Sequence, residues 1–134
     1  MEKFTHREIG TTPSFDELQQ ILRKSIDATA SQEKMIRLPQ DKRILFISDL
    51  HDDPTAIRYV QEQYGKELEE GTVMIVGMGD YGLSCLYELL LLKQQSPQSV
   101  VLLAGNHDTP DDAAAFGGTY IDYIIDNYPG KTGE

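Results

Sequence analysis

The chain has 134 residues, a length that favours a single domain and argues against a two-lobed enzyme with a cleft between its lobes. Apolar residues make up 40% and charged residues 25%, the ordinary mixture of a globular protein and not of a disordered one. The 12 Lys and Arg against 22 Asp and Glu give a net charge of -10, which repels phosphate backbones and argues against a nucleic-acid partner.

The cysteine count and the apolar runs indicate a compartment. Cys85 is the only cysteine, so no internal disulfide can form, and MEKFTHREIG lacks the apolar run of a secretory signal. We therefore expect a cytoplasmic protein. The longest apolar run, in LYELLLL, is far too short to span a membrane, so no membrane partner is expected.

The first predicted element is an amphipathic helix that runs from Ser14 to about Ala30. Residues 1–13 read as a loose N-terminal arm, and residues 14–134 as the folded part. Ser14 and Glu17 match a Ser-x-x-Glu capping box. Apolar residues then follow at helical spacing: Phe15, Leu18, Ile21, Leu22 and Ile26.

After Pro39 the chain alternates between apolar runs and helix starts. The run ILFIS leads to Asp53-Pro54 and a helix that Gly65 ends; VMIVG leads to a helix over residues 83–95; VVLLAG leads to a helix start at Thr109-Pro110. Continuous apolar strands alternating with helices predict an α/β fold with a mostly parallel sheet buried on both faces. We expect three strands and about four flanking helices.

Each predicted strand ends in side chains that could bind a metal. Asp49 and His51 follow the first strand, Asp80 the second, and Asn106 and His107 the third. The carboxyl ends of parallel strands share one edge of a sheet, so these side chains should converge there. Asp49 and His51 would point the same way if the strand continued through them.

Carboxylate, imidazole and amide oxygen together suit Mn, Fe or Zn. A carboxylate such as Asp80 could bridge two such ions. Paired metals stabilise the attacking and leaving oxygens of a phosphoryl displacement, and a nearby His can protonate the leaving alkoxide. The pattern therefore predicts phosphoester hydrolysis.

These motifs resemble those of the calcineurin-like metallophosphoesterases, whose pattern runs D-x-H, then G-D, then G-N-H-[DE]. They stand here as SDLHD, GDYGLSC and GNHD, most similar to the phosphoprotein (serine/threonine) phosphatase branch. The resemblance implies a partial domain over residues 14–134, equivalent to the N-terminal half of a four-layer α/β sandwich. It implies two divalent metals, with Asp49, His51 and Asp80 on one, Asp80 and Asn106 on the second, and His107 as general acid. The implied substrate is a phosphorylated protein or small phosphoester.

The sequence departs from that family in two respects. Leu83 and Ser84 occupy positions where the phosphatase branch has an Asp-Arg pair that supports the catalytic His and binds phosphate. The family also completes its metals with downstream His residues, whereas the three His here are His6, His51 and His107. We therefore expect one metal or an incomplete pair, in a fragment that is incomplete by itself.

Two other interpretations stay open. The chain could be a short metal-binding or regulatory module that keeps Asp49, His51 and Asp80 without turnover. It could also be a complete small doubly wound domain of the receiver type, with no shared divalent site.

Several other residues have structural interpretations. Asp52, Asp53 and Asp108 read as caps or surface charge, and Cys85 as a core residue. Leu86, Leu89, Leu90 and Leu92 read as helix core, and Tyr120, Tyr123 and Tyr128 as packing on a last helix.

Overall fold

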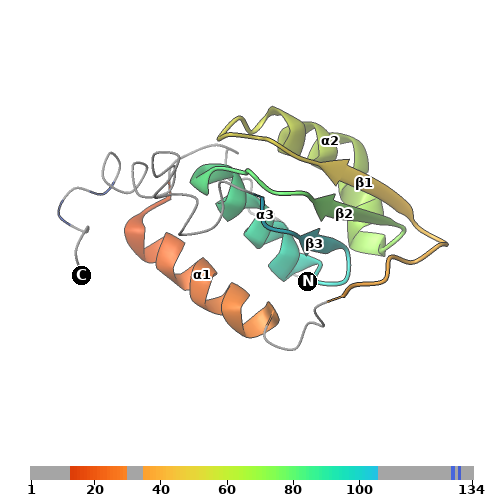
Figure 1. Cartoon of the computed structure of the whole chain (residues 1–134), viewed down its shortest axis with the longest axis horizontal. Coiled ribbons are helices and arrows are strands. Elements are labelled where there is room, and N and C mark those ends of the chain that lie inside the picture. Colours follow the sequence, from red (N-terminus) through yellow and green to blue (C-terminus); the bar gives the residue numbers. More distant parts are fainter. Residues whose placement is uncertain (1–12, 30–34, 106–127, 129, 131–134) are drawn as a thin grey trace.

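The computed structural model describes residues 13–29, 35–105, 128 and 130 (Figure 1). In chain order these residues form α1 (Phe15–Thr29), β1 (Arg43–Ile47), α2 (Thr55–Glu70), β2 (Val73–Gly77), α3 (Leu83–Gln95) and β3 (Val100–Leu102). The predicted α/β class, the strand count and the bounds of α3 are confirmed. The helix start predicted at Thr109 lies outside the described residues.

The three strands form a parallel sheet in the order β1-β2-β3. Arg43 pairs with Val73, and Ile75 pairs with Val100. All five residues of β2 are buried because the strand has a neighbour on each side. The parallel register brings the carboxyl ends of all three strands to one edge, as predicted.

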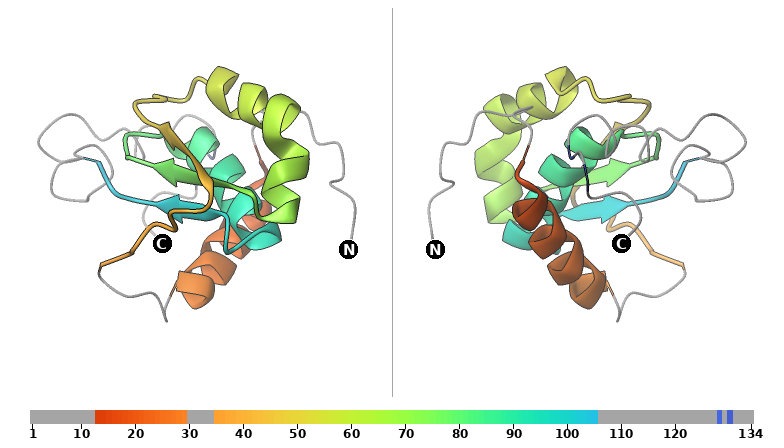
Figure 2. Two further views of the ribbon diagram at one scale, coloured as in Figure 1. Left: turned by 90° about the vertical axis from the view of Figure 1, so that its right-hand side faces the viewer. Right: turned by 90° about the vertical axis from the view of Figure 1, so that its left-hand side faces the viewer.

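The described helices lie on one side of the sheet (Figure 2). α2 and α3 share one hydrophobic cluster with the sheet, in which Ile57 and Leu89 meet Ile75. α1 packs on α3 instead of on the sheet, through Leu18 and Ile21. The helices α2, α3 and α1 thus follow one another in that order, with α3 between the other two (Figure 1).

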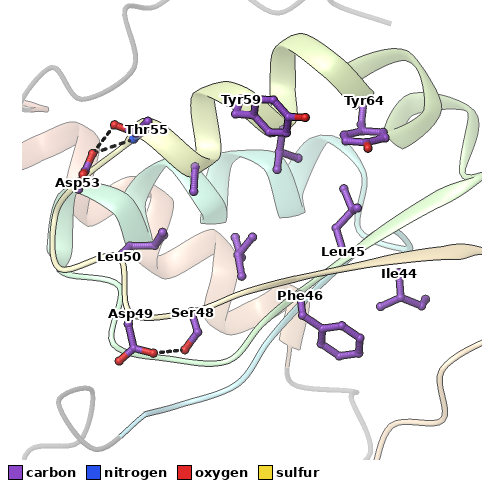
Figure 3. Close-up of a pocket in the computed structure, with 13 residues that line it drawn as sticks. Ile44, Leu45, Phe46, Ser48, Asp49, Leu50, Asp53, Thr55, Tyr59 and Tyr64 are labelled. Atoms are coloured by element: carbon purple, nitrogen blue, oxygen red, sulfur yellow. Dashed lines mark hydrogen bonds between the residues drawn. The ribbon is translucent and has the colours of Figure 1, made fainter.

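The strand β1 departs from the expected burial on both faces, whereas β2 meets that expectation with Ile75 buried on one face and Met74 and Val76 on the other. Leu45 points toward α2 and is partly buried, whereas Phe46 points away and is 62% exposed (Figure 3). Within the described residues β1 has a neighbouring strand on one side only, and no described helix covers the second face. An apolar run therefore did not distinguish this edge strand from a central one.

The predicted capping box starts α1. The Ser14 N–H donates to Glu17 Oε2 at 2.8 Å, and the Glu17 N–H donates to Ser14 Oγ at 3.1 Å. The two bonds satisfy donors that the first turn of a helix leaves without partners. The helix then ends at Thr29, close to the predicted end.

The helix α2 is longer than predicted. It does not end at Gly65 but continues to Glu70, and Gly71 closes it in the left-handed conformation with φ 76°. Leu68 extends the apolar face that Ile57 and Val60 begin, and its burial outweighs the helix penalty of one glycine. At the other end, Pro54 and not Asp53 occupies the N-cap position, one residue later than predicted. Asp53 still contacts the start of the helix, because its Oδ1 accepts a hydrogen bond from the Thr55 N–H at 3.0 Å.

The remaining structural predictions fall mostly in the core. Cys85 and Leu89 are fully buried, and Leu90 and Leu92 are buried on the same helix. Tyr128 packs edge-on against Phe15 with ring centroids 5.5 Å apart, and its hydroxyl donates to the Pro13 carbonyl at 2.6 Å. Tyr120 and Tyr123 lie outside the described residues. No helix in the described part of the chain is long and apolar enough to cross a membrane.

Candidate metal centre

The loops that follow β1 and β2 run side by side beyond the end of the sheet. Backbone hydrogen bonds continue the ladder: Asp49 N–H donates to Gly79 O at 3.2 Å, and His51 N–H donates to Asp80 O at 3.1 Å. The Asp52 N–H adds a third bond to Tyr81 O at 2.9 Å. These bonds fix the spacing between the two loops that carry the predicted ligands.

The backbone turns sharply at these ligands. Asp49, His51, Asp52 and Asp80 have φ values of 53°, 45°, 65° and 55°, in the left-handed region that costs L-residues about 1–2 kcal/mol each. The strand ends at Ile47 and does not continue through Asp49 and His51, so the condition under which the two side chains would point the same way is not met. The two side chains converge through a turn, and such a concentration of strained residues is typical of functional sites.

Three side chains, which we call the metal group, meet where the loops after β1 and β2 run side by side. Asp49, His51 and Asp80 each offer one ligand atom, and these atoms lie within 4.8 Å of one another. His51 Nε2 is 3.8 Å from the nearer Asp49 oxygen. The Asp49 and His51 side chains are 66% and 54% exposed, whereas Asp80 is buried. The metal group is therefore open to solvent on the side of Asp49 and His51 and closed on the side of Asp80.

Ser48 restricts the orientation of Asp49. Its hydroxyl donates to Asp49 Oδ2 at 2.6 Å, while Oδ1 is the atom that lies nearest His51. A hydrogen bond to one carboxylate oxygen leaves the other available to a cation. Ser48 thus acts on a candidate ligand from its neighbouring position.

The loop after β3 reaches the same place through two glycines. A Cβ on Gly79 would overlap the backbone of Gly105, and a Cβ on Gly105 would lie 2.7 Å from the Asp80 backbone nitrogen. Gly105 therefore lies directly against Asp80. Asn106 and His107 follow it in the chain but are outside the described residues, as is Asp108.

Tyr81 ties the ends of β2 and β3 together. Its ring is buried, and its hydroxyl donates to the Leu103 carbonyl at 2.5 Å. No sequence pattern indicates this role of Tyr81, because its partner is 22 residues away.

A groove of about 880 Å³ extends from the metal group along β1. It lies between β1 and α2, with Ser48 and Asp49 near one end and Tyr64 at the other (Figure 3). Its lining between the ends is mostly apolar.

The family model for calcineurin-like phosphoesterases matches residues 42–132, about two thirds of the chain. The chain belongs to this family. The match covers β1 to β3 and all three motifs, but it identifies no branch within the family. A search of curated proteins finds no match. α1 lies outside the calcineurin-like match, although it packs on α3 within it.

The two positions at which this calcineurin-like chain departs from the phosphatase branch have structural partners of their own. Leu83 is buried against Leu18 and Ile21 of α1. Ser84 donates two hydrogen bonds to the Asp52 carboxylate, one from its N–H and one from its hydroxyl. Asp52 therefore caps α3, which agrees with its interpretation as a cap, although the sequence did not identify which helix.

Proposed function

We propose that this chain carries the metal-binding part of a metal-dependent phosphomonoesterase. The observation that carries the proposal is the convergence of Asp49, His51 and Asp80, with ligand atoms within 4.8 Å, at the sheet edge of a calcineurin-like domain. The three residues come from two loops that backbone hydrogen bonds hold together.

The donor set fits a divalent metal. Two carboxylates and one imidazole form the mixed oxygen and nitrogen set that suits Mn, Fe or Zn. Asp80 supports this fit because its carboxylate is buried, and a buried carboxylate is stabilised by a cation or by hydrogen bonds. A net charge of -10 further favours cation binding.

Bound metal would polarise the phosphate and supply hydroxide near neutral pH. The residues of the chain have separate roles around it. Ser48 orients the Asp49 carboxylate, and Asp80 lies between the loops after β1 and β3. We assign Asn106 to a second metal beside Asp80, since it directly follows Gly105, which lies against Asp80. We assign His107 as the general acid that protonates the leaving alkoxide.

The proposed substrate class is a phosphomonoester, on a protein or a small molecule. Within this class, the more specific proposal is a serine/threonine protein phosphatase. The Asp-Arg pair of that branch is replaced here by Leu83 and Ser84. Because the Ser84 hydroxyl donates to Asp52, phosphate binding at this position would need a different donor.

The test combines metal titration with hydrolysis of p-nitrophenyl phosphate in the presence of Mn²⁺. We expect Asp80→Asn to abolish tight Mn²⁺ binding and any metal-dependent turnover. Asp41→Asn is the matched control, because Asp41 is exposed, lies outside the metal group and loses the same charge. Mn²⁺ binding that is unchanged by Asp80→Asn would refute the proposed site.

A second candidate function is a metal-binding module without turnover. The burial of Leu83 and the commitment of Ser84 to Asp52 favour it, since both remove groups that would support catalysis in the phosphatase branch. One tightly held Mn²⁺ with no hydrolysis, unchanged by His107→Ala, would support this function. Metal-dependent hydrolysis that His107→Ala reduces would support the enzyme.

A further inference from the structure

We propose that Asp52 is a positioning residue that holds the loop of Asp49 and His51 in the geometry needed for metal binding. It does so by bonding to the start of α3. The inference rests on the proposed metal site and concerns how that site is kept in shape.

The contacts of Asp52 reach across the chain. Its Oδ1 accepts hydrogen bonds from the Ser84 N–H at 2.9 Å and from the Ser84 hydroxyl at 2.8 Å. Its own N–H donates to the Tyr81 carbonyl at 2.9 Å. Three bonds therefore join the residue next to His51 to the segment that directly follows Asp80.

The start of α3 depends on this long-range contact. Gly82 occupies the N-cap position and has no side chain with which to cap the helix. Asp52 supplies the missing acceptor from a position 32 residues earlier in the chain, and its negative charge suits the positive end of the helix. The metal-binding loop and α3 thus stabilise each other.

The absence of a side chain at Gly82 leaves room for the Asp52 carboxylate. A Cβ on Gly82 would overlap the Asp52 carboxyl group, so the glycine allows the side chain to approach. Asp52 itself has φ 65°, a conformation that Asp and Asn tolerate better than other side chains. Since Oδ1 is committed to Ser84 and Asp52 is absent from the metal group, its effect on a metal would be indirect.

The test compares Mn²⁺ dissociation constants of variants of the full chain by titration calorimetry, with folding checked by circular dichroism. We expect Asp52→Ala to weaken binding by about 10- to 100-fold, as removal of an outer-shell partner does at other metal sites. Asp52→Asn should stay within about 3-fold of wild type, since an amide oxygen accepts the same two bonds and Asn tolerates the backbone conformation. Ser84→Ala should give a smaller loss than Asp52→Ala because the backbone N–H remains.

Asp53→Ala is the matched control. It removes the same charge one residue further on, but Asp53 bonds to Thr55 of α2 instead of to α3. The Mn²⁺ dissociation constant of the Asp53→Ala variant should stay close to that of wild type. Equal weakening by Asp53→Ala would show that net charge, not positioning, is responsible.

The remaining outcomes are distinct. Wild-type affinity in Asp52→Ala would overturn the positioning role and leave the metal site intact, as would an Asp52→Asn variant as weak as Asp52→Ala. Absence of Mn²⁺ binding in wild type would overturn the proposed function and this inference with it. If Asp52→Ala does not fold, Asp52→Asn and Ser84→Ala decide, and wild-type affinity in Ser84→Ala would then overturn the role.

Discussion

Gly79 and Gly105 lie so close that a Cβ on Gly79 would overlap the backbone of Gly105. They belong to the loops after β2 and β3 and flank Asp80 from two sides. Gly79 also has φ 110°, which only glycine adopts readily. The approach of Gly105, the first residue of the third motif, to Gly79 and Asp80 therefore depends on the absence of two side chains.

We expect Gly79→Ala to lower the free energy of unfolding by about 2–4 kcal/mol, because backbone strain adds to steric overlap. Chemical denaturation monitored by circular dichroism measures the change. Gly65→Ala is the control: it lies inside α2, a Cβ there would meet nothing within 4 Å, and alanine should stabilise the helix by about 0.5–1 kcal/mol. Comparable stability of the two variants would contradict the close approach.

The capping box of α1 gives a second expectation. Ser14→Ala removes the acceptor of the Glu17 N–H bond and should cost about 1 kcal/mol of stability. Gln20→Ala, at an exposed position on the same helix, should change stability by less than about 0.5 kcal/mol. Denaturant midpoints compare the two, and an unchanged midpoint in Ser14→Ala would show that α1 does not need its cap.

The burial of a side chain in the sheet depends on the position of its strand, and so does the stability lost when that side chain is truncated. Ile75 is fully buried in β2, so Ile75→Ala should cost about 2–5 kcal/mol. Phe46 on β1 is 62% exposed, so Phe46→Ala should cost far less, below about 1.5 kcal/mol. Thermal unfolding of both variants tests the strand order. A larger loss for Phe46→Ala would mean that the exposed face of β1 is covered.

Burial raises the pKa of the Cys85 thiol to about 12 from its usual value of 9.0. Between these values the unfolded chain releases the proton while the folded chain keeps it. The free energy of unfolding should therefore fall as pH rises above 9, by up to about 1.4 kcal/mol per pH unit.

Cys85→Ala removes this contribution, so the stability difference between wild type and variant should be constant below pH 9 and fall above it. Burial lowers the pKa of Lys93, which acts in the opposite direction, but it is common to both proteins and cancels in the difference. Denaturant unfolding from pH 8 to 10.5 measures the effect. A difference that stays constant over this range would contradict the buried thiol.

Much of the local structure could be predicted because its causes are near in sequence. The capping box of Ser14 and Glu17 involves residues three apart, and it forms as expected. The apolar runs became parallel strands, since continuous hydrophobic segments are buried most readily in a sheet with helices beside it. The prediction that α2 ends at Gly65 was wrong because it considered the helix penalty of one glycine and not the burial of Leu68.

The candidate site was predicted in part for the same reason. Parallel strands end at one edge, so the meeting of Asp49, His51 and Asp80 followed from their places after the strands. The turn that brings Asp49 and His51 together did not follow, because their left-handed backbone is imposed by bonds to the neighbouring loop.

By itself, the sequence determined the α/β class, the order of the elements and the three motifs of a calcineurin-like domain, because these depend on periodicity and on neighbouring residues. Only the tertiary structure decided that β1 lies at an edge of the sheet formed by the described residues, that Gly79 meets Gly105, and that Asp52 caps α3 through Ser84. Each of these depends on contacts between residues that are far apart in the chain, and such contacts leave no periodic pattern in the sequence.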